Sequence, residues 1–412
     1  MSDADTVELS AEEAEAFRVR CRAFLDEHAT GIELDGPDPR GEQSLAGARV
    51  FQQALADAGL AGLTYPKAYG GQGLTQEHER IWREEYASRP NMTIQLTISH
   101  GMALPMLAEY GSDEHKAQFL AKNISAEELW CQMFSEPGAG SDVASLQTRA
   151  VLDGDEWVIN GQKVWTTLAH ACEYGILIAR TDPEQPKHSG ITMFIVDMHA
   201  PGVEIRPIHQ IDGGMHFNEI FFTDVRIPKD WQVGDLNDGW RLATSMLMYE
   251  RVAIGAGSTS GVAHTTADWL IKAAIASGKI DDPVVRQELM KLYCHESAKS
   301  LVSMRTRAEL KAGKTPGPGG SLGKLHGAVI AKMAQGLTME VVGPAAAAWD
   351  ADDEDGRQWQ RSVLSAFQAS IAGGTDEIQK NIIGDRVLGL PREPSADKGV
   401  QFKDLLVGSA SG

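Results

Sequence analysis

The chain has 412 residues and a formal net charge of −19 at pH 7. This length is enough for two or three domains with substantial cores, while so acidic a surface argues against binding to duplex nucleic acid or to an anionic membrane. The first residues lack the cationic and apolar parts of a signal peptide, and no run of about 18 apolar residues follows. We therefore expect a cytoplasmic protein.

Four cysteines are spread over the chain without a CxxC pair: Cys21, Cys131, Cys172 and Cys294. Such spacing favours reduced, buried thiols over a disulfide framework or a zinc site. We expect no metal centre.

The first part of the chain has the pattern of helices. Apolar residues recur at three- and four-residue spacings over residues 11–27 and 46–59. The glycine-rich residues 64–75 are typical of a loop.

The pattern changes to strands after residue 130. Asp153-Gly154 and Asn160-Gly161 are dipeptides typical of tight hairpin turns. Further short strands are predicted at residues 175–179, 191–196, 203–207 and 219–222. No helical pattern separates these strands, so a small antiparallel barrel or sandwich is favoured over a parallel βαβ sheet.

The chain becomes helical again from about residue 238. Asn237, Asp238 and Gly239 can cap an apolar helix that runs to about residue 277. The flanking helical parts can pack together as one bundle, with the strand-rich part inserted between them.

Residues 135–142 (SEPGAGSD) form the first motif that indicates chemistry. Proline and small residues predict a turn with exposed backbone N–H groups, and Ser135 and Ser141 add hydroxyls. This mixture of donors and acceptors suits the edge of a flat polar heterocycle. An ordinary glycine-rich loop explains the composition equally well.

The second motif is KVWTT at residues 163–167. Trp165 and Thr167 are two residues apart, so on a strand they face the same side. An aromatic plane beside a hydroxyl suits stacking and hydrogen bonding with a flat ring. Taken alone, the pattern more often means a half-buried strand tryptophan.

Glu250 stands on an apolar helix face. Met246 and Ala253 lie four residues before it and three after it, on the same face. Removing a carboxylate from water is costly and should raise its pKa, as a general base working near neutral pH requires. The alternative is a structural ion pair with Arg251 or another cation, although adjacent helix residues diverge by about 100°.

Gly373 and Gly374 precede a helix that begins near Thr375. A glycine pair at a helix N-terminus can present N–H groups to a carbonyl oxygen or a phosphate. A plain helix cap is compatible with the same sequence.

The order of these motifs resembles the acyl-CoA dehydrogenase family. The resemblance also includes YPKAYGGQG at residues 65–73 and a GWR…ER helix, and it covers residues 10–393. It implies an α+β fold with an N-terminal helical domain (residues 1–130), a central antiparallel β-barrel (residues 131–235) and a C-terminal four-helix bundle (residues 236–412). It implies FAD between the barrel and the C-terminal helices.

The resemblance implies roles for individual residues. Ser141 would also meet the pantetheine of the substrate, and Arg251 looks like a substrate contact. The positions that would bind the cofactor are Met133, Phe134, Ser135, Gly140, Ser141, Trp165, Thr166, Thr167, Thr375 and Glu377.

One departure concerns the catalytic base. Most relatives have a glutamate where this chain has Gly373, whereas a minority have it on the long helix before an arginine, as in Glu250-Arg251. We therefore expect two catalytic residues, Glu250 as base and Gly373 as a backbone donor to the thioester carbonyl. The pattern is similar to bacterial members that act on steroid side chains or other bulky acyl-CoA esters.

A second departure concerns the subunit interface. The Arg-x-x-Phe-Gly motif that a neighbouring subunit lends to FAD is missing from residues 277–292, and residues 340–346 (EVVGPAA) replace a glycine-rich stretch. We expect a homodimer or homotetramer in which Arg286 or Lys291 supplies the charge. The alternative is a heterotetramer with a second dehydrogenase-like chain.

The expected activity is FAD-dependent α,β-dehydrogenation of a branched or bulky acyl-CoA to the trans-2-enoyl-CoA, within fatty acid and lipid β-oxidation. Electron-transferring flavoprotein is the expected acceptor. Two alternatives are an acyl-CoA oxidase that uses oxygen and a non-catalytic flavin-binding subunit. The presence of Glu250 argues against the second.

Overall fold

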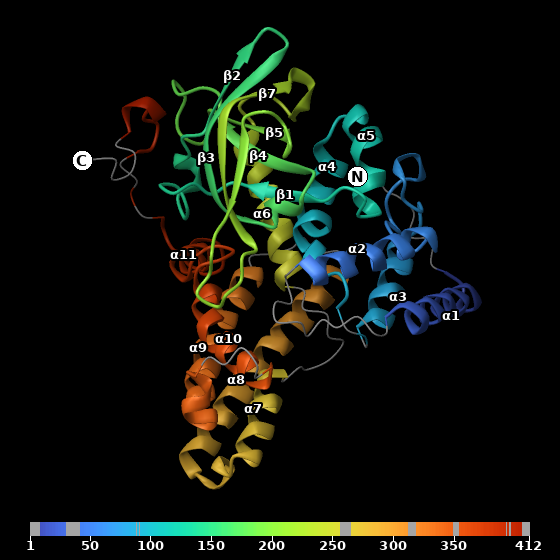
Figure 1. Cartoon of the computed structure of the whole chain (residues 1–412), viewed down its shortest axis with the longest axis vertical. Helices are drawn as coiled ribbons and strands as arrows, with labels where there is room; N and C mark the ends of the chain where they lie inside the picture. Colours follow the sequence, from blue (N-terminus) through green and yellow to red (C-terminus); the bar gives the residue numbers. More distant parts are fainter. Residues whose placement is uncertain are drawn as a thin grey trace. The chain divides into compact units, whose positions relative to one another are not determined.

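The computed structural model describes residues 9–29, 42–87, 89, 91–255, 265–311, 319–348, 354–392, 394 and 397–405. The chain divides into two compact units (Figure 1). The first comprises Met1–Gln210, Gly214–Glu250 and Ser395–Gly412, and the second comprises Ile211–Gly213 and Arg251–Pro394. Each unit is described by itself.

The N-terminal part of the first unit is helical, as predicted. Its helices are α1 (Ala11–His28), α2 (Glu42–Asp57), α3 (Gln76–Tyr86), α4 (Leu104–Tyr110) and α5 (Asp113–Ile124). Ser10 begins α1 with a capping box to Glu13. The loop predicted at residues 64–75 is confirmed, and Gly70 is required there because its φ is +87° and a Cβ would lie 2.6 Å from that of Ala121.

The strands of the first unit form one sheet. They are β1 (Trp130–Met133), β2 (Arg149–Asp153), β3 (Glu156–Thr167), β4 (Tyr174–Arg180), β5 (Ile191–Asp197), β6 (Val203–Pro207), β7 (Phe217–Pro228) and β8 (Gln232–Val233). Their order is β6-β7-β3-β2-β4-β5-β8, with β1 added beside β4 (Figure 1).

The predicted closed antiparallel barrel is wrong in two respects. The sheet is open, because β6 and β8 stand at its two ends and do not pair. Strands β1 and β2 both run parallel to β4. A parallel pair needs a long crossover, and the loop after β1 together with β2 and β3 supplies it without a helix. A sequence pattern that lacked helices therefore concealed the parallel pairs.

The hairpin predicted at Asp153-Gly154 is confirmed, with Gly154 at a φ of +64°. The turn predicted at Asn160-Gly161 is wrong, because β3 continues through both residues with a bulge. A Cβ on Gly161 would lie 2.5 Å from Thr148 Oγ1. This glycine permits a close approach between neighbouring strands rather than a reversal of the chain.

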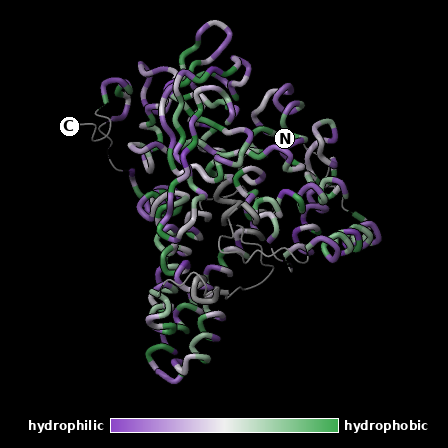
Figure 2. The backbone as a smooth tube through the Cα atoms, in the orientation of Figure 1, coloured by the Kyte–Doolittle hydropathy of each residue, from purple (hydrophilic) through white to green (hydrophobic). Residues whose placement is uncertain are grey.

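Strands β4 and β5 are buried on both faces, and Figure 2 shows them as hydrophobic segments. Alternate side chains enter two different cores. Ile176 and Ile195 belong to a cluster shared with the N-terminal helices, whereas Leu177 and Phe194 belong to a cluster within the strand-rich part. Two central strands therefore join the helices to the sheet.

The helices that follow are α6 (Gly239–Gly255), α7 (Thr265–Ala276), α8 (Pro283–Lys311), α9 (Gly319–Val342), α10 (Glu354–Ser365) and α11 (Asp376–Arg386). The helix predicted from about residue 238 to residue 277 falls on α6 and α7 and on the intervening residues 256–264, which lie outside the described part of the chain. Helix α9 contacts α7, α8, α10 and α11, so the predicted C-terminal helical domain is confirmed. Glu296 on α8 accepts hydrogen bonds from the first N–H groups of α7.

All four cysteines are free thiols. Cys21, Cys131 and Cys172 are buried as predicted, but Cys294 is exposed on α8. Among the helices that the structure describes, none is both long enough and apolar enough to cross a membrane.

Candidate functional site

The predicted site residues fall into two groups. The first group, from Met133 to Thr167, lies in the loop after β1 and at the end of β3, within the first unit. The second group follows Gly373 in the second unit. Glu250 and Arg251 are on α6, but their side chains lie outside the described part of the structure.

The loop after β1 is a tight turn with open space beside it. Glu136 and Ala139 exchange backbone hydrogen bonds of 3.1 and 3.0 Å, and the carbonyl of Ser135 accepts a bond from the N–H of Val164 on β3. Gly140 and the preceding Gly138 are exposed, and a Cβ on either would meet no atom within 4 Å. Ser141 is exposed next to them, whereas Met133 and Phe134 are buried.

A buried ion pair holds this turn against β3. Lys163 is fully buried, and its Nζ donates to the Glu136 carboxylate at 2.8 Å and to the Phe134 carbonyl at 3.0 Å. The same carboxylate accepts the N–H groups of Gln147 and Thr148. Burial opposes the charge, yet the neighbouring cation and these donors hold the pKa of Glu136 below its usual value.

Trp165 presents an open aromatic surface. It is 59% exposed, its φ is +62°, and β3 bulges between Lys163 and Thr166 at this point. Thr166 is buried and Thr167 is half-buried, so the exposed aromatic side chain stands out from its neighbours. A non-glycine residue in the left-handed region costs about 1–3 kcal/mol, and such strain is concentrated at functional sites.

A C-terminal segment, residues 397–405, contacts Lys187 and Arg180, two side chains that also bind the chain after β1. Lys187 forms ion pairs with Asp142 of this loop and with Asp397. Phe402 covers the Arg180 guanidinium at 3.6 Å, and Arg180 donates to the Ala144 carbonyl. The sequence offered no signal for this contact, because its partners are far apart in the chain and follow no periodic pattern.

Helix α6 is fixed up to the residue before Glu250. Gly239 begins the helix so close to β5 that a Cβ would lie 2.6 Å from the Thr192 carbonyl carbon. Met246 is fully buried, and the hydroxyl of Tyr249 contacts the Glu109 carboxylate. Position 250 follows Met246 by four residues, so it occupies the same helix face.

The second group lies where α11 begins. Gly373 and Gly374 have φ values of +66° and +86°, and no described residue accepts a hydrogen bond from either N–H. Thr375 caps α11 through the Ile378 N–H, and the buried Gln379 donates to the Gly373 carbonyl at 2.8 Å. These bonds fix the turn that carries the two glycines at the start of α11, and free N–H groups at a helix N-terminus can bind an acceptor.

The two acidic residues after Thr375 differ. Asp376 forms an ion pair with Lys332 at 3.0 Å and lies 3.9 Å from Lys324, which fixes the first turn of α11. Glu377 is exposed. Asp376 therefore has a structural role, whereas the Glu377 carboxylate faces solvent.

Three family models match the chain consecutively: the acyl-CoA dehydrogenase N-terminal domain over residues 11–127, the middle domain over residues 131–225 and the C-terminal domain over residues 237–388. The chain belongs to the acyl-CoA dehydrogenase family, whose members are flavoprotein oxidoreductases. The predicted resemblance is confirmed.

The chain is similar to named relatives and solved structures of this family over more than nine-tenths of its length. The acyl-CoA dehydrogenase IpdE1 of Mycobacterium tuberculosis is 38% identical and covers 93% of this chain and 99% of its own. The solved steroid ACAD Tcur3481-Tcur3483 is 27% identical, with a TM-score of 0.76 and coverage of 93% and 99%. The ChsE4-ChsE5 complex from M. tuberculosis is 29% identical, with a TM-score of 0.73 and coverage of 94% and 100%.

The ion pair beneath the loop can be tested by Lys163→Met. This change leaves the Glu136 carboxylate buried without its cation, so we expect the free energy of unfolding to fall by about 3–5 kcal/mol. Combining it with Glu136→Gln should recover part of this loss, because the amide carries no charge and its single oxygen still accepts one of the two backbone N–H groups that bond to separate carboxylate oxygens. Urea unfolding measures both variants, with Lys291→Met as the control for an exposed pair. A loss below about 1 kcal/mol for Lys163→Met would contradict the role.

Proposed function

We propose that the protein is an FAD-dependent acyl-CoA dehydrogenase that converts a branched or bulky acyl-CoA to the trans-2-enoyl-CoA, with Glu250 as the base. The observation that carries this proposal is the α6 helix, which is fixed by Met246 and Tyr249 directly before Glu250. The family models, which match residues 11–127, 131–225 and 237–388, support the same proposal. The proposal includes the predicted domain limits, with the N-terminal helical domain ending at residue 130 and the strand-rich domain at residue 235.

The residues present fit a flavin. The exposed Trp165 offers a plane for stacking, and the open turn around Gly140 and Ser141 offers backbone donors and a hydroxyl to a heterocycle edge. Met133 and Phe134 are buried directly before this turn, and the Ser135 carbonyl accepts a hydrogen bond from the Val164 N–H on β3. Thr166 and Thr167 follow Trp165 at the end of β3. When bound, FAD supplies the hydride acceptor for the β carbon of the substrate.

The residues near α11 would hold the carbonyl and the cofactor. The unpaired Gly373 N–H would donate to the thioester oxygen as the α proton leaves, and losing one such donor typically costs about 2.7–4 kcal/mol of transition-state stabilisation. Thr375 and Glu377 would lie toward the cofactor diphosphate. Glu250 would take the α proton, with Arg251 contacting the substrate, and Ser141 would meet the pantetheine.

Two alternatives for the reaction lead to different measurements. An oxidase would use the same residues but would let oxygen reach the reduced flavin, so reoxidation in air would be fast. A dehydrogenase would reoxidise slowly in air and rapidly with electron-transferring flavoprotein, which is the acceptor we propose. A non-catalytic flavin subunit would show no bleaching of the flavin by any acyl-CoA.

The base assignment predicts that Glu250→Gln abolishes flavin bleaching by acyl-CoA and leaves the flavin spectrum intact. The amide keeps the size of the side chain but cannot accept the α proton. Anaerobic stopped-flow spectroscopy measures the bleaching, and Glu288→Gln on α8 controls for loss of a carboxylate elsewhere. Bleaching at the wild-type rate in Glu250→Gln would assign the base to another residue. A glutamate at position 373 should not restore activity, because the φ of +66° there strains any side chain.

A branched or ring-bearing substrate is the second expectation. By the family resemblance, Gly373 has no side chain where most relatives carry a glutamate; this leaves space, and a pocket with unfilled volume binds small ligands poorly. The likeness to a steroid ACAD supports the same view. We expect a higher kcat/KM for cyclohexanecarbonyl-CoA or a larger ring ester than for butyryl- or octanoyl-CoA. A higher kcat/KM for the straight-chain esters would contradict this prediction.

The oligomeric state is the third expectation. Either a homodimer or homotetramer supplies the missing cation through Arg286 or Lys291, or a second dehydrogenase-like chain completes a heterotetramer. The likeness to the ChsE4-ChsE5 and Tcur3481-Tcur3483 complexes supports the second arrangement. In this chain Lys291 already forms an ion pair with Glu288.

The ratio of FAD to chain in protein expressed alone decides between them. Near-stoichiometric FAD with turnover would establish the homo-oligomer. Empty or inactive protein that regains FAD on co-expression with a chain that carries Arg-x-x-Phe-Gly would establish the heteromer.

A further inference from the structure

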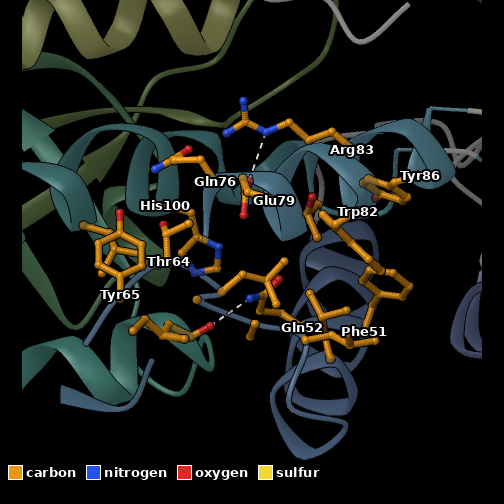
Figure 3. Close-up of a pocket in the computed structure, with 18 residues that line it drawn as sticks. Phe51, Gln52, Thr64, Tyr65, Gln76, Glu79, Trp82, Arg83, Tyr86 and His100 are labelled. Atoms are coloured by element: carbon orange, nitrogen blue, oxygen red, sulfur yellow. Dashed lines mark hydrogen bonds and ion pairs between the residues drawn. The ribbon is translucent and has the colours of Figure 1, made fainter. Parts of the chain in front are cut away.

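A cavity of about 360 Å³ opens among the N-terminal helices, away from every residue assigned above (Figure 3). Helices α2 and α3, residues 60–65 and residues 93–104 form its walls. Part of its lining is apolar, from Phe51, Leu55, Trp82 and Leu104. A space of this volume with a partly apolar wall fits a small ring system.

Four polar side chains around this cavity have atoms to which no described residue forms a hydrogen bond. Gln52, Thr64, Tyr65 and His100 line the space, and Figure 3 shows Gln52, Thr64 and His100 gathered beside one another. Among the described residues, no hydrogen bond engages the hydroxyls of Thr64 and Tyr65. Burial, reinforced by the nearby Glu79 carboxylate, raises the pKa of Tyr65, so its phenol keeps the proton that it can donate.

Gln52 and His100 each form a hydrogen bond with a backbone carbonyl at the end of α5, and these bonds determine which of their atoms are available to a ligand. Gln52 Nε2 donates to the Ile124 carbonyl at 2.8 Å, which leaves Oε1 as an acceptor. His100 Nε2 lies 2.8 Å from the Asn123 carbonyl. Burial lowers the pKa of His100 to about 4, so the ring is neutral near pH 7, with its proton on Nε2 and an acceptor at Nδ1.

The hydrogen-bonding atoms around the cavity favour some functional groups of a ligand over others. An alcohol can accept hydrogen bonds from the two hydroxyls and donate one to either of the two acceptors. A ketone only accepts, so it would leave Gln52 Oε1 and His100 Nδ1 unpaired, at about 1–3 kcal/mol for each buried group. A carboxylate would face two acceptors and the Glu79 carboxylate. An ammonium would find Glu79 already paired with Arg83.

The cavity lies near the helix that carries the proposed base. Tyr65 and Tyr249 pack against the same hydrophobic cluster of the first unit, and Tyr249 directly precedes Glu250 on α6. All of these residues up to Glu250 belong to the first unit. A substrate held at Glu250 therefore has this cavity within the same unit.

We propose that the cavity binds a hydroxyl-bearing alicyclic group, with Tyr65 and Thr64 donating to the alcohol oxygen and Gln52 or His100 accepting its proton. Resting on the proposed function, the source of this group is the far end of the substrate's acyl chain. A free cyclic alcohol has the same chemistry and is the other source.

The test compares two decahydronaphthalene-bearing acyl-CoA esters that differ only in a hydroxyl on the distal ring. In the wild-type protein we expect kcat/KM for flavin bleaching to favour the hydroxyl ester about tenfold, the value of one well-made hydrogen bond. Tyr65→Phe should lower this preference, the ratio of the two kcat/KM values, because phenylalanine cannot donate to the alcohol oxygen and only Thr64 remains as a donor. Tyr69→Phe is the matched control, because Tyr69 is in the same loop but its hydroxyl bonds to Asp113.

Calorimetry with free decahydronaphthol separates the remaining outcomes. Equal bleaching by the two esters, together with alcohol binding that Tyr65→Phe abolishes, would establish the cavity but assign it to a separate ligand. Equal bleaching with no alcohol binding would overturn the proposal while the dehydrogenase function stands. If neither ester bleaches the flavin, the proposed function fails. The calorimetric comparison of wild type with Tyr65→Phe then still shows whether the cavity binds the alcohol through Tyr65.

Discussion

Lys163 and Glu136 lie side by side where water is excluded, and the loop after β1, which carries several of the residues proposed to contact the flavin, is built around them. A buried ion pair is a poor source of net stability, since desolvation offsets much of the attraction. Its geometric effect is larger, because the carboxylate also holds Gln147 and Thr148 while the ammonium holds the Phe134 carbonyl. Both ends of the loop are thereby fixed to β3, next to the strained and exposed Trp165.

The same constraint explains how the first unit joins its two kinds of structure. Strands β4 and β5 are apolar on both faces, so one face must be covered by the N-terminal helices and the other by the rest of the sheet. Ser99 secures this junction by accepting the N–H of Trp130 and the side-chain amide of Asn123. Asn123 and Ile124 then orient the polar side chains of the N-terminal cavity.

Several local features were predictable because neighbouring residues decide them. The helices near residues 11 and 46, the Asp153-Gly154 hairpin and the cap at Thr375 depend on spacing within one or two turns. Asn160-Gly161 has the same local signature as a hairpin, yet β7 pairs along both sides of it and makes it a bulge. The distinction depends on a strand that is some 60 residues away in the chain, and such a partner leaves no trace in a dipeptide.

The ordered motifs of the sequence determined the family, the helix–sheet–helix plan and the candidate site residues, because chemistry requires particular side chains at particular spacings. Tertiary structure alone decided that the sheet is open, that Lys163 serves Glu136, and that Phe402 returns to cover Arg180. It also decided that Tyr65, Gln52 and His100 surround one cavity. Each of these contacts joins residues that are distant in sequence, and burial together with hydrogen-bond satisfaction selects them only once the chain has packed.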